Sequence, residues 1–208
     1  SLTGYIEEIS AVLEQMAGGN MAQSITSEFR GDFVRLKESI NAILGSLNGV
    51  LLDINNAAAY DRIGDLRLEI PDLNVNSTIV GVPIDDGLWN LDWLWSQVGY
   101  LEETAFPTWD GNSALTAHNF DANGLPGPFE KLETLTWGKQ VIIHGWGKKY
   151  IYEVRYVNQW TAPDDVGVIT HEETPWLTLI TCRGYNDKTK SYNWRVVVRA
   201  VLVDVQDE

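Results

Sequence analysis

Cys182 is the only cysteine in the 208 residues, and it ends the alternating, β-branched run from Trp176 to Cys182. Such a run is typical of a strand in a half-buried sheet. A thiol at a strand end can act as a nucleophile, and its reactive form is the thiolate. The alternative is a small, buried and inert structural cysteine. The residues around the thiol are therefore needed to distinguish a nucleophilic cysteine from a structural one.

A second β-rich run favours the nucleophile. Arg195 opens this run thirteen residues after the thiol, and the residues between, 183–190, are rich in turn formers. A hairpin of this kind places a guanidinium beside the sulfur. A guanidinium is always charged and has paired donors for a substrate backbone or an oxyanion, although an exposed strand arginine is the simpler alternative. Arg199 has even spacing from Arg195, so we expect it on the same face, farther from the sulfur, in a structural or surface role.

A family resemblance rests on these two strands and on an upstream histidine, His118. The Thr-Leu-Ile-Thr-Cys strand, the arginine on the following strand and the Leu-Thr-Ala-His segment together resemble a sortase, over about residues 64–205. Three further segments are similar to the family's first strand, its approach to the histidine and its histidine loop: residues 68–73, 111–115 and 118–129. The resemblance implies a mainly β protein with a sortase-like closed β-barrel.

The resemblance also implies a cysteine transpeptidase with the triad Cys182, His118 and Arg195. In this interpretation Cys182 attacks the threonine carbonyl of an LPxTG-like sorting signal, His118 protonates the departing amine, and Arg195 holds substrate and oxyanion. Thr181 corresponds to the family's contact with the sorting signal. The acyl group then passes to an amino acceptor, either a cell-wall peptide or a pilin lysine, and no cofactor is implied.

The other two histidines have simpler roles. His144 follows a predicted strand and His171 lies in an acidic segment, so we expect strand termination and an exposed loop. The sequence has no His-x-x-x-His or Cys-x-x-Cys spacing, and no metal site is predicted. Two other classes stay open: a hydrolytic cysteine peptidase, whose Cys–His pair would usually be oriented by Asn or Asp, and a non-enzymatic signalling or oligomerisation module.

Composition limits the partners and the compartment. The chain is 44% hydrophobic with nine Trp, which is ample for a core, and its net charge of −14 argues against a nucleic-acid partner. The family resemblance implies an extracytoplasmic, membrane-associated protein. The sequence contains no apolar run of the roughly 18 residues that a membrane span needs. If the protein is membrane-anchored, we expect the anchor upstream of Ser1.

Residues 1–58 differ from residues 59–208 in composition and pattern. They contain no Pro or Trp, and apolar residues follow a heptad from Ile6 to Met16 and from Phe33 to Ile54, which predicts a helical coiled-coil segment. This segment resembles the HAMP linker and adjoining coil of chemotaxis receptors; a helical dimerisation or spacer element is the alternative. Gly45 and Gly49 each cost roughly 1 kcal/mol in a helix, so we expect partner helices, most simply from a homodimer.

Residues 59–208 are predicted to form the barrel domain. Alternating or β-branched runs with Gly and Pro between them indicate short strands of a closed sheet. The segment from Leu88 to Trp95 is predicted to be a short capping helix or a loop, with its three Trp in the core.

Overall fold

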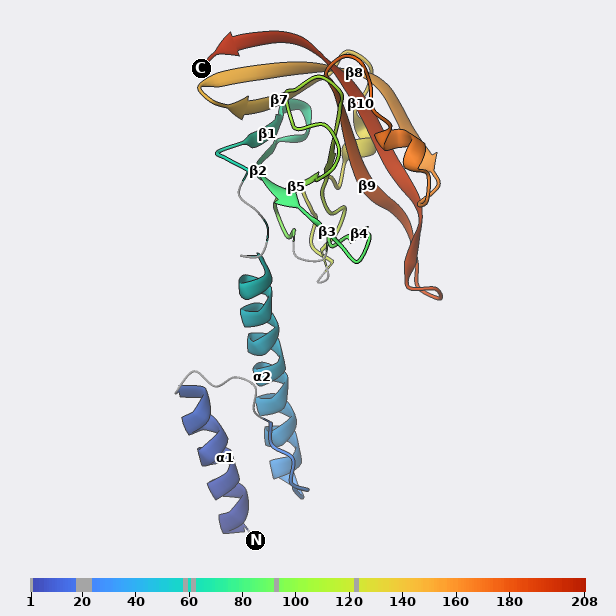
Figure 1. The fold of residues 1–208 in the computed structure, drawn as a ribbon. Helices are drawn as coiled ribbons and strands as arrows, with labels where there is room; N and C mark the ends of the chain where they lie inside the picture. The colour runs from blue at the N-terminus through green and yellow to red at the C-terminus, as the bar shows by residue number, and fades with distance from the viewer. Residues whose placement is uncertain (1, 18–23, 58–59, 61–62, 92–93, 122–123) are drawn as a thin grey trace. The chain divides into compact units, whose positions relative to one another are not determined.

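The computed structural model describes the chain except residues 1, 18–23, 58–59, 61–62, 92–93 and 122–123, and it leaves the side chains of residues 2, 17 and 48–57 undescribed. The chain divides into two compact units, Ser1–Ala58 and Ala59–Glu208 (Figure 1). Each unit has its own apolar core. Among the described residues, no helix is both long enough and apolar enough to cross a membrane.

The first unit contains the helices α1, Leu2–Ala17, and α2, Asp32–Ala57. Their shared core includes Tyr5 and Phe29, whose ring centroids are 4.4 Å apart, and the buried Ile40. Asn41 fixes the connector to α2, because its side chain accepts from the Ile25 N–H at 2.8 Å and donates to the Ile25 carbonyl at 3.0 Å.

The heptad pattern predicts the helices, but only part of it is buried. Ile9, Met16, Phe33 and Ile40 pack into the core of the unit. Other heptad residues are exposed in this structure: Ile6, Leu13, Leu36, Ile43 and Leu47. The side chains of Val50 and Ile54 lie outside the described residues. Because each helix has one neighbour here, one stripe of each is covered and the adjoining stripe is left open.

The second unit is a closed β-barrel, and the prediction of a mainly β fold is confirmed. Among the described residues, the strands follow the order β1-β2-β5-β6-β9-β10-β8-β7 around the barrel. Their bounds are β1 Arg67–Ile70, β2 Val75–Val82, β5 Val98–Leu101, β6 Asn112–Thr116, β7 Gln140–Gly145, β8 Lys148–Thr161, β9 Trp176–Asn186 and β10 Ser191–Asp207. A separate small hairpin pairs β3, Ile84–Asp85, with β4, Leu88–Trp89.

Short 3-10 turns and loops connect these strands. The turns are η1 Pro71–Leu73, η2 Leu132–Thr134 and η3 Val166–Ile169. The segment from Leu88 to Trp95 contains the short strand β4 rather than a helix, and Trp93 lies outside the described residues. Trp89 packs against a second apolar cluster around Leu94 and Val82. The strand forms because a tight turn at Asp86 and Gly87, both with positive φ, pairs Leu88 and Trp89 with β3.

Alternation along β9 and β10 defines two faces of the sheet. Leu177 and Leu179 on β9, and Val196 and Val198 on β10, belong to the barrel core. Their neighbours in the sequence therefore face outward. Ile180, for example, packs against the second apolar cluster instead of the barrel interior. The outer face is the one that carries Cys182.

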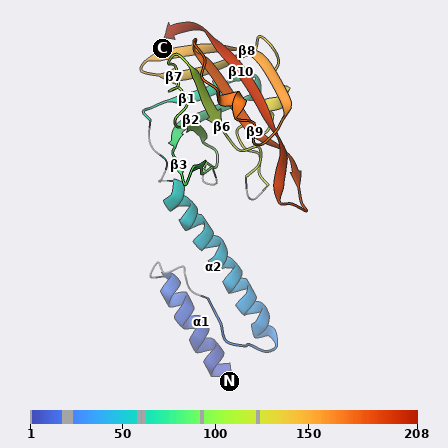
Figure 2. The same cartoon turned by 45° about the vertical axis from the view of Figure 1, so that its right-hand side comes forward.

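The hairpin of β9 and β10 is longer than the sequence predicts. The predicted turn covers residues 183–190, whereas β9 continues to Asn186 and β10 begins at Ser191. Tyr185 and Tyr192 are paired across the two strands, with ring centroids 5.1 Å apart. This cross-strand pair stabilises the extension despite the turn-forming residues. The tip of the hairpin projects beyond the rest of the barrel (Figure 2).

Candidate functional site

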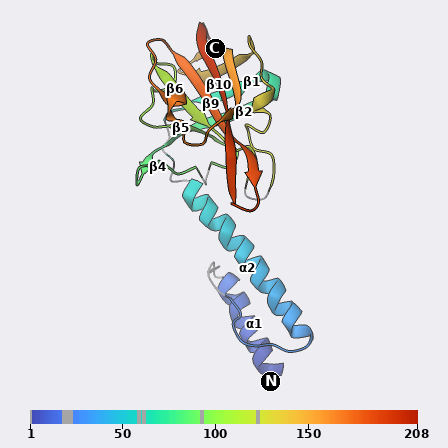
Figure 3. The same cartoon turned by 90° about the vertical axis from the view of Figure 1, so that its right-hand side faces the viewer.

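Cys182 and Arg195 are direct cross-strand partners in the antiparallel pair β9 and β10. Both side chains are half-buried and lie on the outer face of the sheet. On its other side Arg195 is opposite Thr161, at the end of β8. The structure thus arranges a thiol, a guanidinium and a hydroxyl in one row across three strands. Figure 3 turns β9 and β10 toward the viewer.

The parallel pairing of β6 with β9 brings the His118 segment to the same end of the sheet. Thr116, the last residue of β6, is paired with Ile180, so the chain reaches His118 at the level of Cys182. The Ala117 N–H donates to the Ile180 carbonyl at 3.4 Å. The Asn119 side-chain Nδ2 donates to the Cys182 carbonyl at 2.9 Å. The backbone of His118 is therefore fixed on both sides to the strand that carries the thiol.

The loop after His118 folds back onto the same backbone. The Phe129 N–H donates to the His118 carbonyl at 3.2 Å, and the Gly127 N–H donates to the Asn119 carbonyl at 2.7 Å. A Cβ atom at Gly127 would lie 2.2 Å from the His118 oxygen, so only glycine permits this approach. The loop thereby holds His118 from the side opposite β9.

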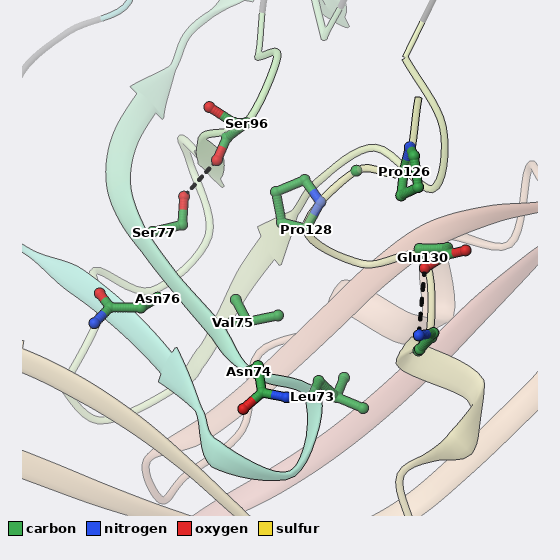
Figure 4. A pocket seen from close by; sticks show the side chains of 11 residues that line it. Leu73, Asn74, Val75, Asn76, Ser77, Ser96, Pro126, Pro128 and Glu130 are labelled. Carbon is green, nitrogen blue, oxygen red and sulfur yellow. Dashed lines mark hydrogen bonds and ion pairs between the residues drawn. The ribbon is translucent and has the colours of Figure 1, made fainter. Parts of the chain in front are cut away.

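This loop also forms one wall of a groove of about 310 Å³ (Figure 4). Pro126 and Pro128 line one side, and Asn74, which directly precedes β2, and Ser77 on β2 line the other. The Ser77 hydroxyl donates to the Ser96 carbonyl at 2.6 Å across the groove floor. His118 is not among the described residues that line this groove.

Burial controls the ionisation of the thiol. Removal from water raises the pKa of Cys182 above its ordinary value, and the positive charge of Arg195 lowers it in part. The thiol is consequently the main form at neutral pH. The pKa of the neighbouring Tyr192 is also raised. Burial is the main cause, and the charge of Cys182 adds to the increase. A nucleophilic role for Cys182 therefore needs a base that takes the thiol proton.

Thr181 does not share the face of Cys182. It is 1% exposed, and its hydroxyl donates to the Ala117 carbonyl at 2.8 Å. Neighbouring residues on a strand point to opposite faces, so a residue next to the thiol points into the barrel. The expected contact of Thr181 with a sorting signal stays a prediction. Thr181 ties β9 to the His118 segment.

The remaining predicted residues have separate surroundings. His144 is buried, with Nδ1 2.5 Å from Glu208 Oε1 and Nε2 2.7 Å from Glu69 Oε2, and His171 is exposed. Arg199 lies on the same face as Arg195, and its guanidinium is paired with the carboxylate of Glu172. In the part of the chain that the structure describes, no group of three or more His, Cys, Asp or Glu side chains could hold a metal ion.

The sequence analysis missed two residues of the site, Asn119 and Thr161. Asn119 directly follows His118, and an amide beside a candidate histidine is a signal that could have been noticed. Its Oδ1 is buried without a hydrogen-bond partner among the described residues. Thr161 reaches Arg195 only through the pairing of β8 with β10, and a β-bulge precedes it, so no local pattern indicates it.

These features are those of a sortase, and comparison with known proteins agrees. Residues 68–203 match the family model described as the sortase domain, which is more than half of the chain, so the chain belongs to the sortase family. Residues 2–49 match the model described as the HAMP domain. The Bacillus subtilis protein YwpE, whose name assigns it provisionally to the sortases, is 35% identical over 101 residues, which is 46% of this chain and 86% of YwpE.

Solved sortase structures share the barrel fold. Sortase E1 from Streptomyces coelicolor is 23% identical with a TM-score of 0.54, over 69% of this chain and 90% of that chain. Sortase C1 from Streptococcus agalactiae is 22% identical with a TM-score of 0.56, over 69% and 70% of the two chains. The Clostridium perfringens sortase D5 transpeptidase is 22% identical with a TM-score of 0.53, over 68% and 79%.

Proposed function

We propose that this chain is a sortase-type cysteine transpeptidase that cleaves an LPxTG-like sorting signal and transfers its acyl part to an amino acceptor. The observation that supports it best is the pairing of Cys182 with Arg195 at the level of the His118 segment. The solved sortase E1 holds a tripeptide in its active site, which supports a peptide substrate here.

In the proposed reaction the Cys182 thiol gives its proton to His118 while Sγ bonds to the threonine carbonyl carbon. Burial raises the pKa of the thiol, so the neutral thiol has to give up its proton in this step. Arg195 stabilises the tetrahedral oxyanion. The C–N bond then breaks, and His118 protonates the departing amine. The product of this half-reaction is a thioester on Cys182.

The second half-reaction reverses these roles. The acceptor amine attacks the thioester carbonyl carbon, the C–S bond breaks, and the proton released by the amine returns through His118 to the sulfur. We propose a cell-wall peptide or a pilin lysine as the acceptor. Such substrates imply an extracytoplasmic enzyme held at the membrane.

For the first unit we propose self-association as a homodimer. The exposed heptad residues on α1 and α2 support it: Ile6 and Leu13 recur at seven residues on α1, as do Leu36 and Ile43 on α2. A second copy would cover these stripes in a helical bundle.

Mass spectrometry of the protein after incubation with an LPxTG-like peptide tests the proposed reaction. We expect an adduct on Cys182 with the mass of the acyl fragment, and its conversion to an amide product when a triglycine acceptor is added. A product that is always the free acid would indicate a hydrolytic cysteine peptidase. Absence of any adduct or cleavage would favour the non-enzymatic module.

A further inference from the structure

A side chain takes the place of a main-chain donor where β6 leaves β9, beside the thiol. The regular parallel pairing ends at Thr116 and Ile180, and the Ala117 N–H still donates to the Ile180 carbonyl. Main-chain donors of a parallel ladder recur every two residues, so the next would be the Asn119 N–H to the Cys182 carbonyl. In the structure this carbonyl accepts from the Asn119 side-chain Nδ2 at 2.9 Å. An amide side chain therefore joins the histidine segment to the residue that carries the thiol.

This arrangement holds the main chain of the histidine segment farther from β9 than a ladder would. Paired strands lie about 4.8 Å apart, and the Nδ2 of an asparagine is farther from its Cα than the main-chain nitrogen is. The loop that follows holds the same main chain from its other side, because the Gly127 N–H donates to the Asn119 carbonyl and the Phe129 N–H to the His118 carbonyl. The length of the Asn119 side chain thereby sets how far the His118 main chain stands from the thiol.

The amide of Asn119 uses only half of its hydrogen-bonding capacity. A carbonyl oxygen can only accept, so Nδ2 has to face the Cys182 carbonyl and Oδ1 turns away from it. Oδ1 is buried and has no hydrogen-bond partner within the described ranges of the chain. A buried acceptor without a partner costs stability, and such an atom in a native protein calls for an explanation. Fold stability alone therefore does not account for an asparagine at this position.

We propose that Asn119 is a positioning residue, whose amide holds Cys182 and the His118 main chain at the separation that proton transfer between thiol and imidazole requires. The inference rests on the proposed function, in which the proton of the thiol passes to the His118 ring while Sγ bonds to the threonine carbonyl carbon. A misplacement of about 1 Å between reacting groups can lower turnover about 100-fold. Asn119 should therefore affect kcat more strongly than KM.

Steady-state kinetics of Asn119→Leu with an LPxTG-like peptide test this role. Leucine has a similar shape but no donor. It exchanges the unpaired Oδ1 for an unpaired Cys182 carbonyl, so the melting temperature should stay within about 3 °C of the wild type. We expect kcat to fall about 10- to 100-fold and KM to change by less than about threefold. Asn119→Gln keeps the amide donor and should recover most of the lost kcat. If the leucine variant does not fold, Asn119→Ala makes the same comparison.

Gln159→Leu is the matched control. Gln159 is half-buried like Asn119, and its Nε2 donates to the Glu133 carbonyl at 3.1 Å, which connects β8 with η2. This bond does not involve the thiol or the histidine segment, so kcat should stay within about twofold. An equal loss of kcat in Gln159→Leu, an unchanged kcat in Asn119→Leu, or no recovery in Asn119→Gln overturns the positioning role and leaves the transpeptidase standing.

A spectroscopic measurement separates this proposal from the proposed function. If the wild type cleaves no peptide, the proposed function fails, and ¹H–¹³C spectra of the His118 imidazole decide the positioning role. Methyl methanethiosulfonate blocks Cys182, the only cysteine of the chain. This block should shift the His118 signals in the wild type and in Gln159→Leu, and it should shift them less in Asn119→Leu. Shifts of equal size in the three proteins, or no shift in the wild type, overturn the proposal.

Discussion

The barrel unit and the helical unit differ in how completely each buries its own apolar residues. In the barrel, Leu68, Tyr152 and Leu179 are 0% exposed, whereas in the helical unit Ile6 and Ile43 are 52% and 53% exposed. A closed barrel leaves no free sheet edge and encloses its core. Two helices cover only one stripe of each other. The barrel therefore encloses its own core, whereas the helices leave apolar residues exposed that the proposed second copy would cover.

This difference separates the expected effects of substitution. In the barrel, the register of β9 with β10 and β6 determines which side chains meet, so changes there should alter the chemistry. In the helical unit, the exposed apolar stripes are the proposed association surface, so changes there should alter the oligomeric state.

The largest effect is expected for Cys182→Ala. Cys182 is the only cysteine in the chain, so this variant has no thiol, and acyl-adduct formation and peptide cleavage should both be abolished. Because the residue is only half-buried and alanine is small, the barrel should stay folded by circular dichroism. Retained cleavage by the purified variant would contradict the assignment of the nucleophile.

His118→Ala and Arg195→Ala should each lower turnover by about 10²–10⁴-fold, since one removes the proposed proton carrier and the other the proposed oxyanion donor. Steady-state kinetics with the cleaved peptide measure it. His144→Gln is the matched control: it removes contacts to two carboxylates, so its melting temperature should fall while turnover well below that temperature is kept. Equal losses of turnover in the control would show that the wrong histidine has been chosen.

The pH dependence of thiol alkylation should follow the two opposing influences on Cys182. Burial raises the pKa of the thiol, so the midpoint for iodoacetamide should lie above that of an ordinary cysteine. Arg195→Gln removes the charge that lowers this pKa, and the midpoint should move to still higher pH. Arg183→Gln is the control, because this guanidinium is paired with Glu133 at 2.9 Å; an equal shift in both variants would exclude a specific effect of Arg195.

A substitution in the exposed stripe of α2 should change only the association. Ile43→Glu places a charge in the proposed dimer interface, and light scattering should report a monomer instead of a dimer. Ala42→Glu adds the same charge at the neighbouring exposed position outside the stripe and should leave the dimer intact. A wild-type chain that is monomeric at high concentration would refute the association itself.

The smallest effect is expected when residues 1–58 are removed. Every residue of the proposed site lies in the barrel unit, so kcat for peptide cleavage should stay within about twofold while the protein becomes a monomer. A truncated barrel that is folded but inactive would show that the helical unit contributes to the reaction.

Local patterns in the sequence predict the main elements of both units. The alternation from Trp176 to Cys182 and along residues 195–203 predicts the two strands that the structure contains, because side-chain period and burial are coupled in a sheet. The heptad pattern predicts α1 and α2 for the same reason. The candidates Cys182, His118 and Arg195 were also accessible from the sequence, through spacing and family resemblance.

Only the tertiary structure decided which residues share a face and which stripes are open. Thr181 turns inward although it adjoins the nucleophile, and Thr161 joins Arg195 from a strand that is distant in the sequence. Ile9 is packed while Ile6 is exposed within one heptad pattern. Register, bulges and neighbouring helices depend on contacts between segments far apart in the chain, and no local pattern records them.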